Sequence, residues 1–325
     1  MQTFLRRLVT LGILFPAAVA NTLLLPAVLT VFVVIDLCMS RRMPLTRAYL
    51  VISFYLFWES LGVLAAFAVW IFPGPRLPRL FLTCNYGLQR IWVDGFTRVG
   101  SLLFSLTPDV RGDFAFGERP FILLARHTSL ADTILVSWIV LVRHKIRMRF
   151  VMKQELLWDP CLDIVGNRLP NYFVDRNAKD NTREIANIAA LARGLEPGEG
   201  VVMYPEGTRF SEEKHARALQ RLEEQGQAEL LRYAEQMRHV LPPRLAGTMA
   251  LLENAPGADI VFFAHTGFEG ASSFSEFFRG SMIGREVRVL YWPVPASDIP
   301  SDDAARRQWL YREWLHMDEV VGGWK

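Results

Sequence analysis

The chain has 325 residues, of which 51% are hydrophobic and 21% charged. A mean hydropathy of +0.18 is higher than a water-soluble globule needs, whereas the charge content excludes a protein that crosses a membrane many times. The net charge of +3 is too small for a nucleic-acid-binding surface, so no nucleic-acid partner is expected, but it suits an anionic membrane or a phosphorylated substrate. The three cysteines are far apart and in no metal-ligand spacing, which predicts a reducing compartment without structural disulfides.

The excess of apolar residues is concentrated in the first quarter of the chain. Two apolar stretches, residues 8–37 and 48–72, are joined by the basic segment 40–47. Each stretch is long enough for a membrane helix, so the sequence predicts a pair of such helices. Two prolines and an asparagine in the first stretch also allow a broken helix that re-enters one leaflet, so a spanning pair and a re-entrant pair both stay open. Arginines flank the two sides in similar number and do not fix the orientation.

A cleaved signal peptide is the alternative interpretation of the amino terminus. Arg6 and Arg7 would form its basic start, and the A-V-A sequence at residues 18–20 resembles a cleavage site. The apolar run continues well beyond that point and a second run follows, which favours retained helices. Three prolines and a glycine at residues 73–78 then end the helical segment. We therefore expect residues 1–79 to form a membrane anchor and residues 80–325 to form an α/β domain.

Short apolar segments alternate with helical patterns after residue 111, which is typical of an α/β sheet flanked by helices. The preceding residues 80–106 have a helical pattern that suits packing under the domain or contact with the membrane interface. About six strands are predicted, at residues 121–125, 149–152, 172–174, 201–204, 260–264 and 286–292. Helices are predicted at residues 130–142, 181–195, 211–238 and 302–321. The last of these helices should dock on the domain through one apolar face, formed by Leu310, Trp314, Met317 and Val321.

A histidine and an aspartate lie in the polar break between a predicted buried strand and the next helix. His127 follows the strand at residues 121–125, and Ser129 is placed to cap the helix with Asp132 in its first turn. A histidine beside a carboxylate at the carboxyl end of a buried strand suits a general base with its orienting partner. A helix cap with an incidental histidine explains the same residues, so this segment alone does not decide between the two.

Two further predicted strands end in polar turns that suit an anion. The strand at residues 201–204 is followed by an E-G-T-R turn, made of Glu206, Gly207, Thr208 and Arg209. The glycine lets backbone amides approach a bound group, the threonine offers a hydroxyl, and the arginine can bind phosphate through two N–H groups. Glu206 is a candidate for hydrogen bonds to substrate hydroxyls or for holding the arginine.

Arg176 stands in a third polar turn, after the strand at residues 172–174. Because such turns gather at one edge of an open α/β sheet, we expect all three turns to share one site, with a base from the first and cations for a phosphate from the others. Surface salt bridges would explain either arginine alone.

Several other catalytic chemistries are not indicated by the sequence. It contains no G-x-S-x-G elbow, no H-E-x-x-H pair, no phosphate loop ending in G-K-S or G-K-T, and no paired C-x-x-C, so no metal site is expected. The other histidines have no ligand spacing and are interpreted as structural or exposed: His144, His215, His239, His265 and His316.

Four short motifs resemble the signature blocks of the glycerolipid acyltransferases. H-T-S-L-A-D at residues 127–132, F-V-D-R at 173–176 and E-G-T-R at 206–209 are similar to the first three blocks. L-P-P-R at 241–244, followed by Gly247, is similar to the proline-containing fourth block of the subgroup that includes lysophosphatidic acid and lysocardiolipin acyltransferases. The resemblance covers residues 120–247. Two positions depart from the pattern, because Arg126 replaces a common asparagine and Tyr204 a common phenylalanine.

The resemblance implies a membrane-bound acyltransferase that uses no cofactor, metal or acyl-enzyme. His127, oriented by Asp132, would take the proton of a glycerol hydroxyl as that hydroxyl attacks an acyl thioester, while Arg176 and residues 206–209 hold the phosphate of the acceptor. The implied donor is acyl-CoA or an acyl carrier protein, and the implied acceptor is lysophosphatidic acid, which would become phosphatidic acid. Such donors are cytosolic, so the domain is expected to face the cytoplasm from a lipid bilayer. Another lysophospholipid or an amine-containing lipid as acceptor, and an inactive lipid-binding scaffold, are the alternatives.

Overall fold

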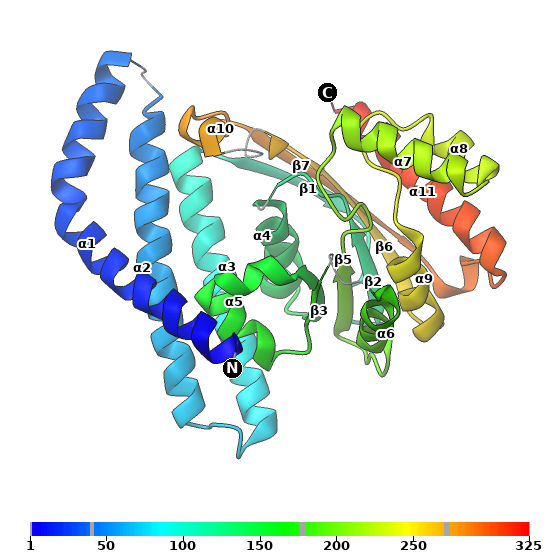
Figure 1. Ribbon diagram of the computed structural model, residues 1–325, viewed down its shortest axis with the longest axis horizontal. Coiled ribbons are helices and arrows are strands. Elements are labelled where there is room, and N and C mark those ends of the chain that lie inside the picture. The colour runs from blue at the N-terminus through cyan, green and yellow to red at the C-terminus, as the bar shows by residue number, and fades with distance from the viewer. Residues whose placement is uncertain (1, 40–41, 130, 176–179, 270–273, 325) are drawn as a thin grey trace.

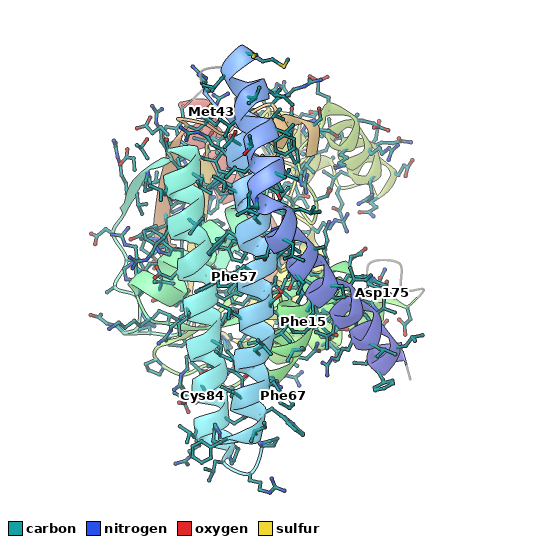
Figure 2. All side chains as sticks on the ribbon, turned by 90° about the vertical axis from the view of Figure 1, so that its left-hand side faces the viewer. Phe15, Met43, Phe57, Phe67, Cys84 and Asp175 are labelled. Atoms are coloured by element: carbon teal, nitrogen blue, oxygen red, sulfur yellow. The ribbon has the colours of Figure 1, made fainter. Side chains whose placement is uncertain are left out.

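Three long helices stand side by side at one end of the molecule (Figures 1 and 2). The computed structural model describes residues 2–39, 42–129, 131–175, 180–269 and 274–324. Its first helices are α1 (Gln2–Met39), α2 (Pro44–Ile71) and α3 (Pro78–Phe104). By length and composition α1 and α2 can each cross a membrane. Two prolines lie inside α1 without ending it.

The α1–α2 pair contacts the rest of the protein through the start of α1 and through α2. At the start of α1, Arg6 and Arg7 both bind the buried carboxylate of Asp163, with contacts of 2.8 and 3.1 Å. In the middle of α2, the fully buried Glu59 accepts a hydrogen bond of 3.1 Å from the backbone N–H of Cys161. Arg6 and Arg7, which precede the first apolar stretch, are therefore partners of the α/β domain.

The opposite side of the pair is apolar and exposed. Figure 2 faces this side, where Phe57 and Phe67 of α2 lie in the open. On α1 the exposed apolar residues extend from one end to the other and include Phe4, Leu8, Ile13, Val19, Leu23, Val31 and Leu37. Exposed apolar area of this extent needs a partner other than water, and it suits a lipid surface.

A seven-stranded sheet forms the centre of the domain, with the strand order β1-β7-β6-β2-β5-β3-β4. Neighbouring strands are parallel except β6 and β7, which are antiparallel. The strands are β1 (Thr107–Gly112), β2 (Phe121–Ala125), β3 (Arg147–Lys153), β4 (Tyr172–Val174), β5 (Glu199–Met203), β6 (Asp259–Thr266) and β7 (Glu286–Val294). This confirms the predicted α/β class with its flanking helices and amino-terminal apolar pair. The unpredicted strand is β1, a half-exposed edge strand whose T-P-D-V-R-G sequence has no apolar run.

The remaining helices cover both faces of the sheet (Figure 1). They are α4 (Ala131–Ser137), α5 (Pro160–Ile164), α6 (Asn181–Ala192), α7 (Glu212–Glu224), α8 (Ala228–Ala234), α9 (Leu245–Asn254), α10 (Phe274–Phe278) and α11 (Asp303–Gly322). A π-helical segment, Trp138–Arg143, extends α4, and short 3₁₀ turns lie at Gln154–Trp158, Gly166–Arg168 and Ala296–Asp298. The prediction of one helix over residues 211–238 is wrong, because Gly226, with a φ of 66°, separates α7 from α8.

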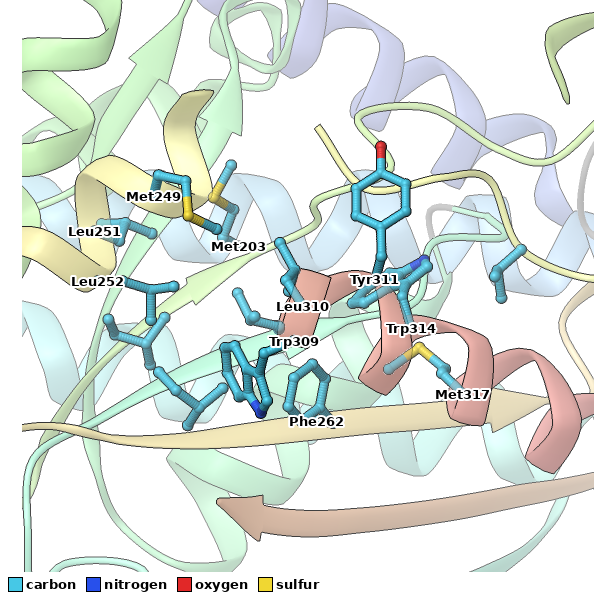
Figure 3. Close-up of a cluster of buried hydrophobic side chains, with 14 of the residues drawn as sticks. Met203, Met249, Leu251, Leu252, Phe262, Trp309, Leu310, Tyr311, Trp314 and Met317 are labelled. Atoms are coloured by element: carbon cyan, nitrogen blue, oxygen red, sulfur yellow. The ribbon is translucent and has the colours of Figure 1, made fainter. Parts of the chain in front are cut away.

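Side chains of the central strands alternate between two cores. Ile122 and Leu124 of β2 pack in the core that includes residues of α6, α9 and α11, whereas Leu123 and Ala125 pack in the core on the side of α3 and α4. Figure 3 shows part of the first core, where Trp309, Trp314 and Met317 of α11 surround Phe262 of β6. All four residues predicted on the docking face of the last helix are fully buried, which confirms that prediction. The parallel pairing of β2 with β5 brings the carboxyl ends of both strands to the same edge.

Candidate active site

His127, in the turn after β2, forms a hydrogen-bonded pair with Asp132, in the first turn of α4. The imidazole Nδ1 of His127 lies 3.2 Å from Oδ1 of Asp132. The other carboxylate oxygen accepts backbone hydrogen bonds from Thr128 and, at 2.9 Å, from Ser129. The Ser129 hydroxyl accepts a bond of 3.1 Å from the Ala131 N–H. The carboxylate of Asp132 therefore both stabilises the turn and holds the imidazole of His127. The helix-cap interpretation and the orienting-partner interpretation thus apply to the same residue. Since Nδ1 is engaged, Nε2 is the nitrogen left for a substrate.

A second histidine lies on the other side of Asp132. His265, at the end of β6, is fully buried, and its Nε2 is 2.9 Å from the Arg126 carbonyl and 3.6 Å from Oδ2 of Asp132. Burial alone would raise the pKa of Asp132, but the hydrogen bond from His127 and the charge of His265 outweigh it and the pKa is lowered. Burial lowers the pKa of His265, although the adjacent carboxylate of Asp132 acts in the opposite direction. Asp132 is thus held as a carboxylate.

Glu206 connects the histidine turn to the L-P-P-R segment. It is 2% exposed, and its two oxygens accept backbone hydrogen bonds from His127 at 2.8 Å and from Leu241 at 2.9 Å. The predicted role of this residue was to bind substrate or to hold Arg209. Its carboxylate instead lies behind the site, where it fixes the backbone of both segments.

Arg126 is an internal cation with its own partners. Its side chain is almost fully buried and donates hydrogen bonds to the His265 carbonyl at 2.6 Å and to Glu269 at 2.9 Å. Although burial opposes the shift, the charge of Arg126 lowers the pKa of Glu269 to about 2. The arginine that departs from the family pattern is therefore neutralised inside the protein and adds no free charge to the site.

A cavity of about 760 Å³ extends from the α2 and α3 helices to the His127 turn. Its α2 and α3 part is mainly apolar and aromatic, with Trp58, Leu61, Leu88, Ile91 and Phe96 among the lining residues. His127 lines the cavity, and the ring of Tyr204 lies beside its imidazole, with 5.0 Å between the ring centroids. An apolar space that reaches a buried histidine suits a lipid chain whose reactive end is presented to that histidine.

Cationic side chains lie at another part of the same cavity. Gly207 and Arg209 of the predicted anion turn line it, together with Lys153 at the end of β3 and Arg244 before α9. Thr208 accepts a hydrogen bond of 3.0 Å from Lys214. Arg176 falls outside the described residues. Within the described ranges, no cluster of three or more metal-ligating side chains is present.

The fold and the order of these turns place the chain among the acyltransferases, since residues 107–243 match the family model described as Acyltransferase. Within that class the chain belongs to the glycerolipid acyltransferases. It is 22% identical to 1-acyl-sn-glycerol-3-phosphate acyltransferase epsilon of Mus musculus over 84% of this chain and 77% of the relative. It is 32% identical to lyso-ornithine lipid O-acyltransferase of Rhizobium meliloti over 34% of this chain and 35% of the relative. An uncharacterised acyltransferase of Schizosaccharomyces pombe is 21% identical over 62% of this chain and 58% of that protein. The protein is therefore a membrane-associated acyltransferase of the lysophospholipid type.

Three residues near the site were missed by the sequence analysis. His265 was interpreted as structural or exposed, and only the β2–β6 pairing brings it to Asp132. Lys153 has a local signal, because it ends a strand beside two others that end in polar turns. Arg244 was noted only as part of the fourth motif, and its approach to Gly207 depends on the packing of α9.

Proposed function

We propose that this acyltransferase moves an acyl chain from a thioester to the free hydroxyl of lysophosphatidic acid and forms phosphatidic acid. The observation that carries the proposal is one cavity with an apolar part between α2 and α3, a His–Asp pair, and the Arg209 turn. Its three parts match an acyl chain, a reacting hydroxyl and a phosphate.

In the proposed reaction, His127 is the general base. Its Nδ1 proton is held by Asp132, so Nε2 accepts the proton of the acceptor hydroxyl as the hydroxyl oxygen attacks the thioester carbonyl carbon. The carbon–sulfur bond then breaks, and the leaving thiolate takes the proton from the imidazolium. The carboxylate of Asp132 stabilises the transient positive charge on the imidazole, which is why its lowered pKa suits the step.

The membrane arrangement follows from the exposed side of the α1–α2 pair. Both helices have contacts with the domain, and their other side is apolar. In this proposal the pair lies with its apolar side in the cytoplasmic leaflet, so lipids reach the cavity from the bilayer and the soluble donor reaches it from the cytosol. Acyl-CoA and acyl carrier protein are the donor classes.

A lysolipid with an amine-containing head group is the second candidate acceptor. The 32% identity to a lyso-ornithine lipid acyltransferase favours it, although that match spans only 111 residues. The reaction at the hydroxyl would be the same, and only the contacts at the head group would differ.

An acceptor screen tests the proposal. Purified protein in phospholipid nanodiscs is incubated with radiolabelled oleoyl-CoA and one acceptor at a time: lysophosphatidic acid, lysophosphatidylcholine, lyso-ornithine lipid or monoacylglycerol. We expect the highest kcat/KM with lysophosphatidic acid. A clear preference for lyso-ornithine lipid would show that this lipid, and not lysophosphatidic acid, is the acceptor. If neither product nor free thiol forms with any acceptor, and an acyl carrier protein donor gives the same result, the inactive scaffold is supported.

A further inference from the structure

Arg244 is fixed against the E-G-T-R turn by its own backbone. Its N–H donates a hydrogen bond of 2.9 Å to the Pro205 carbonyl. Its carbonyl accepts one of 3.0 Å from the Thr248 hydroxyl in α9. These two contacts hold Arg244 between the turn and the start of the helix, so its side chain begins from a defined position beside the turn.

The side chain of Arg244 occupies the space that a side chain at residue 207 would need. A Cβ atom on Gly207 would lie 2.9 Å from Nε of Arg244, closer than real Cβ contacts, and 3.1 Å from its Cζ, which is a tight contact. Gly207 also has a φ of 69°, which favours glycine. Both residues line the cavity with Arg209. The absence of a side chain at residue 207 therefore lets a second guanidinium lie over the turn.

Arg244 has no counter-ion among the described residues. Two other arginines of the domain have carboxylate partners: the buried Arg126 pairs with Glu269, and the partly buried Arg149 pairs with Glu199 at 2.7 Å. No carboxylate in the described chain pairs with Arg244, whose side chain stays accessible. Partial burial and the positive charge of Arg221 both lower its pKa. A cation held beside other cations, without a carboxylate, favours an external anion.

We propose that Arg244 binds the phosphate of the acyl acceptor, and that Gly207 is required because a larger residue would displace its guanidinium. This inference rests on the function proposed above and adds a residue that determines head-group specificity. Glu206 connects the Arg244 segment to the general base, because it binds the backbone N–H groups of both His127 and Leu241. The base and the segment that presents Arg244 are thereby held at a fixed separation, which places the acceptor hydroxyl when the phosphate is bound.

The first test compares Arg244→Gln with Arg217→Gln, an exposed α7 arginine that pairs with Glu213 and is not part of the cavity lining. For Arg244→Gln we expect the KM for lysophosphatidic acid to rise by about tenfold to a hundredfold. The KM for oleoyl-CoA and the rate with neutral monoacylglycerol should stay within about twofold of the wild type. Arg244→Lys should recover part of the loss, since it keeps the charge but not the planar fork. Arg217→Gln should behave as the wild type.

The second test asks whether Gly207 acts through Arg244. Gly207→Ala should raise the KM for lysophosphatidic acid in the wild-type background and add little to the effect in Arg244→Gln. The backbone strain of a positive φ is common to both backgrounds and cancels in this double-mutant cycle. Thermal denaturation of each variant verifies that it is folded.

The outcomes separate this inference from the proposed function. An unchanged KM for lysophosphatidic acid in folded Arg244→Gln, or a change confined to the oleoyl-CoA KM, overturns the inference and leaves the acyltransferase proposal intact. Failure of the wild-type protein to acylate lysophosphatidic acid overturns both. Additive effects of the two substitutions would contradict the role given to Gly207.

Discussion

The cavity has two polar parts that are built in opposite ways. Around His127 the polar groups are buried and bound to one another: Asp132 contacts two imidazoles and two backbone amides, and Glu206 binds two further amides. At the E-G-T-R turn, Arg209 and Arg244 line the cavity and remain partly accessible. In the first part the polar groups bind one another, whereas in the second two guanidinium groups line the cavity. We therefore expect substitutions in the first part to affect kcat or folding, and substitutions in the second to affect the acceptor KM.

The largest effect is expected from His127→Ala. Removing the general base should lower kcat by about 10² to 10⁴, while the protein stays folded and membrane-bound because the Glu206 contact uses the backbone of residue 127. Initial rates with lysophosphatidic acid and oleoyl-CoA measure the loss. His316→Ala, which alters an imidazole about half exposed on α11, is the matched control. Full activity of His127→Ala would refute the mechanism.

The next effect concerns the accessible part, through Arg209→Gln. Losing a charge-assisted hydrogen bond to phosphate costs about 1.5 to 3 kcal/mol, so the acceptor KM should rise roughly 10- to 150-fold. The KM of oleoyl-CoA in the same preparation is the internal control. A fall in kcat with no change in the acceptor KM would remove the distinction between the two parts of the cavity.

Glu206→Gln tests the buried part by stability. A glutamine has one acceptor oxygen for the two backbone N–H groups, so one amide loses its partner at a cost of about 1 to 3 kcal/mol. Burial raises the pKa of Glu206 from 4.5 to about 7. The folded wild type therefore favours the protonated acid, and it loses stability as pH rises through this window.

The stability deficit of Glu206→Gln should accordingly be largest near pH 5 and shrink toward pH 7. Chemical denaturation across this pH range measures it, and kcat should fall more than the acceptor KM rises. A stability deficit that grows with pH would show that Glu206 is ionised between pH 5 and pH 7. A selective rise in the acceptor KM would show that Glu206 binds the substrate.

The smallest effect is expected from Tyr204→Phe. Its ring lies beside His127, but its buried hydroxyl has no hydrogen-bond partner in the described part of the chain. Removing an unsatisfied buried hydroxyl should leave the free energy of unfolding unchanged or raise it by about 1 kcal/mol. Thermal denaturation is the measurement, with kcat determined alongside. A clear loss of stability would mean that the hydroxyl has a partner in the folded protein, and a large loss of kcat would mean that it contacts the reacting groups.

Local sequence patterns predicted the structure correctly where the residues of a single strand or helix define it. The F-I-L-L-A run predicted β2 to the residue, and its polar break placed His127 and Asp132 in one turn. Local patterns failed where an element has no periodic apolar residues. The edge strand β1 is exposed and was not predicted, and the charged segment of α7 and α8 was predicted as one helix although Gly226 divides it. Glu206 was assigned to the correct turn, but its direction depends on where residues 127 and 241 lie, which no local pattern contains.

The sequence by itself determined the α/β class, the apolar amino-terminal helices and the turns that carry the motif residues, because each depends on neighbouring residues and on strand or helix periodicity. The tertiary structure decided which residues from distant segments meet. Parallel pairing of β2 with β5 and β6 brings Glu206 and His265 to the His127 turn. Packing of α9 lays Arg244 over Gly207, and the buried carboxylate of Asp163 ties α1 to the domain. These contacts join residues far apart in the chain, so their geometry depends on the packing of the whole sheet and its helices.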